Sequence, residues 1–119
     1  MFEVRQKPEM VERALLVRFC FDPREMDEAE SLLAELAELV KTLGIEVGEL
    51  VLARCREMHK KFLCGTGKAA EVVELARAHG CDVIVIDNGL APSQQREWER
   101  LADLCVIDRE ELILDIFAK

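Results

Sequence analysis

The chain has 119 residues, of which 50% are hydrophobic and 34% charged, and its formal net charge is −8. This length suits one domain, and the composition excludes a disordered chain. No apolar run reaches the roughly 18 residues that a membrane-spanning helix needs. Residues 1–12 are mixed and charged, without the apolar centre of a signal peptide. We therefore expect a single cytoplasmic domain with no membrane contact.

The predicted elements alternate along the chain. After an irregular lead-in over 1–12, apolar runs predict strands over 14–21, 50–53, 82–87 and 105–107. Apolar residues spaced by three and four predict helices over 26–43, 68–79, 92–103 and 109–119. The fold class is therefore α/β: a single domain, with a four-stranded, mainly parallel sheet (β-α-β-α-β-α-β-α) and helices on both faces. Strand order 2-1-3-4 is favoured, since sequential strands tend to be neighbours.

Charge is spread unevenly over this acidic chain. Residues 1–50 and 69–119 each carry a net charge of −6, whereas residues 51–68 carry +4, and we call this stretch the cationic segment. The acidic body should be repelled by phosphate backbones, so any contact with an anion is expected at the cationic segment. Its basic residues, with Glu57 as the single acid, are Arg54, Arg56, Lys60, Lys61 and Lys68.

A glycine turn, Gly65-Thr66-Gly67-Lys68, ends the cationic segment. A nucleoside triphosphatase P-loop is excluded here, because Phe62 stands where its first glycine belongs and Ala69 where a Ser or Thr should hold Mg²⁺. The turn also matches a relaxed dinucleotide fingerprint, with Asp87 following 20 residues after Gly67, although about ten residues intervene after the strand. The structural alternative is a tight entry into a helix, whose free N–H groups could still hold a phosphate.

Other chemically capable residues are better explained by structure. Asp87 and Asp108 end strands on one sheet edge, where they could hold a cation; we expect Asp87 to bond the Asn88-Gly89 turn and Asp108 to cap the last helix. Trp98 is expected to pack against the core rather than stack on bases. Neither His residue has a partner at metal-ligand spacing, and no catalytic triad or metal site can be assigned. The five cysteines show no disulfide or zinc spacing and are expected to be reduced and structural.

Three stretches resemble one known family. They are the glycine turn at 65–68, the run Leu-Ala-Pro-Ser-Gln-Gln-Arg at 90–96, and the run from Val106 to Arg109 that continues as Leu-Ile-Leu-Asp-Ile-Phe-Ala over 112–118. Over residues 13–119 the chain is similar to the N-terminal α/β domain of the HflX family of ribosome-associated GTPases. The motif positions that carry this resemblance are Pro92, Gln94, Arg96, Asp108, Arg109 and Asp115.

The resemblance implies a non-catalytic accessory domain. Family members continue into a helical segment and a GTPase domain with a true P-loop, so GTP and Mg²⁺ are expected only there and no cofactor in this chain. By resemblance, the partner is the large ribosomal subunit, to which the domain helps dock the GTPase while modulating its activity. The alternatives are a stand-alone nucleotide- or phosphate-binding α/β protein using residues 65–68, or a short paralogue that competes with the full-length GTPase.

Two groups of residues are the candidates for contacts. Phosphate or RNA contacts are predicted at Arg54, Arg56, Lys60, Lys61, Gly65, Thr66, Gly67 and Lys68. The terminal helix is expected to contact the chain's own helical and GTPase domains, or a second copy of the isolated domain, through Ile113, Ile116 and Phe117.

Overall fold

Strand β1 (Arg13–Cys20) lies inside a four-stranded sheet with the order β2-β1-β3-β4, and each neighbouring pair is parallel. The structure is a computed structural model that describes residues 11–118. The other strands are β2 (Glu46–Arg54), β3 (Val83–Ile86) and β4 (Cys105–Asp108). The helices are α1 (Met26–Thr42), α2 (Thr66–Ala78), α3 (Pro92–Ala102) and α4 (Arg109–Ala118). Both the predicted fold class and the predicted strand order are confirmed.

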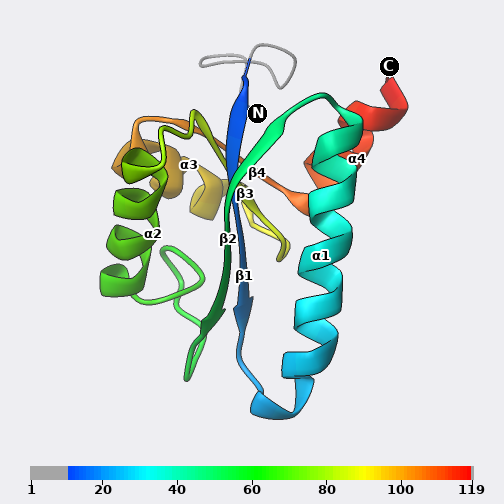
Figure 1. Cartoon of the computed structure of the whole chain (residues 1–119). Helices are drawn as coiled ribbons and strands as arrows, with labels where there is room; N and C mark the ends of the chain where they lie inside the picture. The colour runs from blue at the N-terminus through cyan, green and yellow to red at the C-terminus, as the bar shows by residue number, and fades with distance from the viewer. Residues whose placement is uncertain (1–10, 119) are drawn as a thin grey trace.

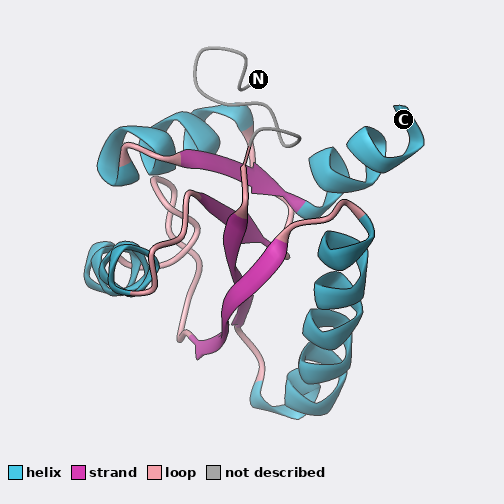
Figure 2. Cartoon of the chain, turned by 45° about the horizontal axis from the view of Figure 1, so that its top comes forward, coloured by secondary structure: helices cyan, strands magenta, loops and turns pink. Residues whose placement is uncertain are grey.

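The helices form two layers around the sheet. Helices α1 and α4 cover one face, and α2 and α3 cover the other (Figures 1 and 2). Alternate residues of β1 serve the two layers: Leu15, Val17 and Phe19 belong to the core under α2 and α3, whereas Ala14 and Leu16 belong to the core under α1. Burial on both faces explains why β1 reads as a continuous apolar run.

Strand β2 is longer than its predicted range of 50–53 and forms one edge of the sheet. The first half of the strand contains two glutamates and a glycine, so it has no apolar run from which a strand would be predicted. An edge strand is only partly buried and needs no such run. The register with β1 shifts between Ala14 and Leu15, opposite Gly48. A Cβ added at Gly48 would lie 2.8 Å from Cys81 Sγ and 2.9 Å from Arg13 Nε, so this close approach favours glycine.

The segments that the sequence analysis named as candidate sites follow the strands at the carboxyl edge of the sheet. The chain leaves β2 into the cationic segment, β3 into the Asn88-Gly89 turn and β4 directly into α4. The predicted lead-in lies outside the described residues except for its last two positions, Val11 and Glu12, which form no regular element. Within residues 11–118, none of the helices has the length and apolar character that spanning a membrane requires.

Candidate functional site

The cationic segment leaves strand β2 at Arg54, crosses the carboxyl edge of the sheet, and enters α2 at Thr66 (green in Figure 1). Its outer part, from Arg56 to Lys61, is exposed, whereas Phe62, Leu63 and Cys64 are buried in the core under α2 and α3. The outer part of the segment therefore exposes its cations to solvent, while residues 62–64 fix the segment to the core.

The five cations of the segment are not equivalent. Lys68 Nζ forms an ion pair with Glu71 Oε1 at 3.0 Å, and Lys61 Nζ lies 5.5 Å from the centre of the Phe62 ring. Within residues 11–118, Arg54, Arg56 and Lys60 are exposed and form no ion pair. Lys68 must first leave Glu71, and Lys61 its contact with the Phe62 ring, before either binds an anion. Arg54, Arg56 and Lys60 are therefore the stronger contact candidates.

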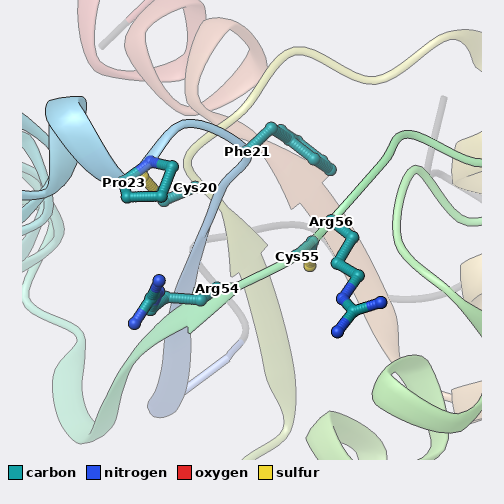
Figure 3. A pocket seen from close by; sticks show the side chains of 6 residues that line it. All are labelled: Cys20, Phe21, Pro23, Arg54, Cys55 and Arg56. Carbon is teal, nitrogen blue, oxygen red and sulfur yellow. The ribbon is translucent and has the colours of Figure 1, made fainter.

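A pocket of about 460 Å³ lies where strands β1 and β2 end (Figure 3). We call it the strand-end pocket; it is lined by Cys20, Phe21, Pro23, Arg54, Cys55 and Arg56. Arg54 and Arg56 lie on either side of Cys55, with their guanidinium groups pointing in different directions (Figure 3). The two arginines are therefore spread along the strand end rather than focused on one point.

The buried base of the segment packs on α3. Trp98 is fully buried, its Nε1 donates a hydrogen bond of 2.9 Å to the Phe62 carbonyl, and its ring contacts those of Phe62 and Phe19. The predicted packing role of Trp98 is confirmed. Leu63 has a φ of +71°, an unusual backbone conformation for a leucine, and reciprocal bonds between the backbones of His59 and Leu63 close the turn.

The glycine turn serves as the entry to α2. Gly65 is the N-cap in an extended conformation, and its carbonyl accepts a hydrogen bond from Ala69 N at 3.0 Å. Thr66 and Gly67 are exposed. Eleven residues, 55–65, separate β2 from α2, whereas a dinucleotide fingerprint follows its strand directly. This geometry favours the tight helix entry over a dinucleotide site.

The prediction for Asp87 is wrong, because its carboxylate does not bond the Asn88-Gly89 turn. The carboxylate is buried and forms ion pairs with Arg18 Nη1 at 3.1 Å and Arg109 Nε at 2.5 Å. Arg109 also binds Glu35 of α1 and the Leu32 carbonyl. Burial opposes the charge of Arg109, but its bond to Asp87 and the fields of Asp87 and Glu35 outweigh that effect and raise its pKa. No local pattern predicts this cluster, because its members lie up to 91 positions apart in the chain (18 to 109).

Asp108 plays the role predicted for it and one more. Its Oδ1 accepts the Glu111 N–H at 2.9 Å and so caps α4, and its Oδ2 accepts the Leu90 N–H at 3.0 Å. Asp108 therefore holds the loop that was assigned to Asp87. The Asn88 side chain forms two bonds of 2.9 Å with the Phe19 backbone and extends the pairing beyond the end of β3.

The remaining motif positions lie on α3 and α4. Pro92 opens α3, Gln94 contacts the cationic segment, and Arg96 is exposed. Asp115 of α4 has one buried carboxylate oxygen without a hydrogen-bond partner in the described residues. On α4, Ile113 and Ile116 are half-buried and the neighbouring Leu114 is 68% exposed. The predicted contact residue Phe117 has a side chain outside the described part.

The cysteines are free thiols, and Cys64 is buried rather than displayed beside the glycine turn. Burial raises the pKa of Cys64 to about 12, so about 10⁻⁴ of it should be thiolate at pH 8. We therefore expect iodoacetamide to label half-exposed Cys55 well before Cys64 in the folded chain, as read by peptide mass spectrometry. Unfolding in urea should make the labelling rates of Cys55 and Cys64 equal. Equal rates without urea would contradict the burial of Cys64.

The same raised pKa predicts how alkaline pH affects stability. An unfolded cysteine ionises near its ordinary value of 9.0, whereas buried Cys64 resists ionisation up to about 12. The unfolded state therefore loses its proton first, and the contribution of Cys64 to stability is present below pH 9 and is lost as pH rises toward 12.

Fold and site together define a parallel α/β domain with a cationic segment in an otherwise acidic chain. Among the described residues, no cluster of three or more His, Cys, Asp or Glu side chains could hold a metal ion. The family model described as "GTP-binding GTPase N-terminal" matches residues 30–118. The chain belongs to this family of N-terminal domains, and its relatives place it in the HflX group.

Those relatives are curated proteins called GTPase HflX. The chain is 61% identical over 119 residues to the protein of Akkermansia muciniphila, covering all of this chain and 27% of the relative. It is 38% identical over 109 residues to that of Escherichia coli, which covers 91% of this chain and 25% of the relative. It is 40% identical over 92 residues to that of Spirochaeta thermophila, which covers 77% of this chain and 22% of the relative. The chain thus spans about a quarter of the length of these relatives.

Proposed function

We propose that this chain is a non-catalytic accessory domain that docks an HflX-like GTPase on the large ribosomal subunit and modulates the GTPase. On this proposal, GTP and Mg²⁺ would be bound by a separate domain of the GTPase. The observation that carries the docking role is a set of three exposed cations at the carboxyl edge of the sheet that form neither an ion pair nor a ring contact within residues 11–118: Arg54, Arg56 and Lys60.

Charge explains how such a surface would select a polyanion. The three cations can each neutralise one phosphate of ribosomal RNA and release its counterion. The rest of the chain is strongly acidic, so RNA would be repelled from other faces and accepted at this edge. Contacts of this kind position a domain on RNA without reading its sequence.

Helix α4 suits the second set of partners, the helical and GTPase domains of the full-length protein. Asp108 caps its start, and Arg109 fixes it to α1 and to Asp87, the residue after β3, while Leu114 is exposed. A helix fixed in this way could transmit its orientation to a neighbouring domain. In the isolated domain the same surface would support a homodimer at high concentration.

Charge reversal tests the docking role. We expect the double variant Arg54→Glu/Arg56→Glu to sediment with large ribosomal subunits about tenfold or more weakly at 0.1 M salt, because two phosphate contacts become repulsive. The slope of log K against log salt should become shallower by about 1.5–2.

The matched control is Lys41→Glu/Arg100→Glu, which changes the net charge equally at two exposed residues outside the cationic segment. Equal effects of the two pairs would show a response to net charge alone and would contradict the proposal. Calorimetry with GTP and ATP separates the alternative: saturable binding by the wild-type chain that is lost in Lys68→Glu would favour a nucleotide site at residues 65–68.

A further inference from the structure

Two side chains of α3 hold the turn that carries Lys60. Gln94 and Trp98 are four residues apart and therefore lie on the same side of the helix. Trp98 Nε1 donates to the Phe62 carbonyl at 2.9 Å, and Gln94 Nε2 faces the carbonyls of Lys60 at 3.3 Å and His59 at 3.5 Å. Three backbone carbonyls of one turn thus point toward donors from one helix.

The chemistry of its partners fixes the orientation of the Gln94 amide. Its Oε1 accepts the Ala91 N–H at 2.9 Å, and a backbone N–H requires an acceptor. The amide nitrogen must therefore face the turn, where carbonyls require a donor. Gln94 consequently joins the first turn of α3 to the turn at 59–63.

Within the turn, the backbone supplies a second restraint. His59 N donates to Leu63 O at 2.9 Å and Leu63 N donates to His59 O at 3.0 Å. Lys60 lies between these bonds with an exposed side chain that forms no ion pair in the described residues. The position of this cation is therefore set by the turn, and the turn is set by α3.

We infer that Gln94 is a positioning residue, which holds the turn at 59–63 so that Lys60 meets its anion without first being ordered. Ordering a loop upon binding has an entropic cost that lowers affinity, and a loop held beforehand avoids it. This inference rests on the proposed function, since the anion is the ribosomal RNA phosphate invoked there.

Two variants separate the roles of the amide. Gln94→Glu keeps an oxygen for the Ala91 N–H but cannot donate to the turn, and Gln94→Met removes both bonds without adding charge. In both, we expect the His59 and Leu63 amides to exchange with deuterium about three- to tenfold faster than in the wild type. The backbone N–H of Gln95, which donates to the Ala91 carbonyl, should keep its wild-type exchange rate in Gln94→Glu.

The matched control is Gln95→Met, which removes an amide bonded to the Val106 carbonyl and Glu111 rather than to the turn. It should leave exchange at His59 and Leu63 unchanged. Unchanged exchange in both Gln94 variants, or an equal rise in the Gln95 control, would overturn the positioning role.

Binding supplies a readout that a purely structural role would not move. Gln94→Met should bind large ribosomal subunits severalfold more weakly with an unchanged salt slope, because every cation is still present. A changed slope with unchanged exchange would contradict the inference. If the wild-type chain fails to bind subunits, the proposed function fails, while the exchange result still decides whether Gln94 holds the turn.

Discussion

Asp87→Ala is expected to lower the free energy of unfolding by about 3–5 kcal/mol, because it leaves two partly buried arginines without their shared carboxylate. The Asp87 side chain is completely buried, whereas Arg18 and Arg109 are 24% and 21% exposed. Arg109 keeps Glu35 and the Leu32 carbonyl, but within the described residues Arg18 forms its side-chain bonds only with Asp87. The loss should therefore be felt most at β1.

Urea denaturation followed by circular dichroism measures this effect. Glu38→Ala is the control, because it removes an exposed carboxylate paired with Lys41 and should change stability by less than about 1 kcal/mol. If Asp87→Ala and Glu38→Ala cost the same, the cluster does not support the fold. A larger loss for Asp87→Ala than for Asp87→Asn would show how much of the effect a neutral hydrogen-bond acceptor can restore.

Trp98→Ala is expected to cost about 3–5 kcal/mol of unfolding free energy, because it empties the largest fully buried side-chain position of the chain's described part. The Trp98 ring contacts Phe19 of β1 and Phe62 of the cationic segment, with ring centres 6.1 and 5.6 Å away. Its loss would also leave the Phe62 carbonyl without a donor. The base of the cationic segment should therefore loosen with the core.

Trp98→Phe separates packing from hydrogen bonding, since it keeps an aromatic ring but removes the indole N–H. We expect a smaller loss, about 1–3 kcal/mol, mainly from the unsatisfied carbonyl. Both variants remove the single tryptophan, so unfolding must again be followed by circular dichroism. A loss below about 1 kcal/mol for Trp98→Ala would show that the two aromatic contacts are not part of the core.

The elements that the sequence predicted well are those in which local pattern and burial agree. The buried run of β3 and the helical spacing over α1 required no knowledge of distant residues, and Asp108 caps the helix that begins beside it. Strand β2 was underestimated, because an edge strand with a glycine at a close contact lacks a continuous apolar signal.

The candidate site was predicted in part. A charge count located the cationic segment, but it could not separate Lys68, which pairs with Glu71, from Arg54 and Arg56, which form no ion pair within residues 11–118. Nor could it find the contacts of Gln94 with His59 and Lys60, or those of Asp87 with Arg18 and Arg109. These contacts join residues far apart in the chain, and only the packing of α3 and α4 on the sheet brings them together.

The docking role proposed for this domain requires that the exposed cations at the carboxyl edge bind phosphates of the large ribosomal subunit. The most direct test is the affinity of the wild-type chain for purified large subunits over a series of salt concentrations. With three phosphate contacts, log K should fall linearly with log salt with a slope of about −2 to −3. An affinity that does not change with salt would contradict the claim.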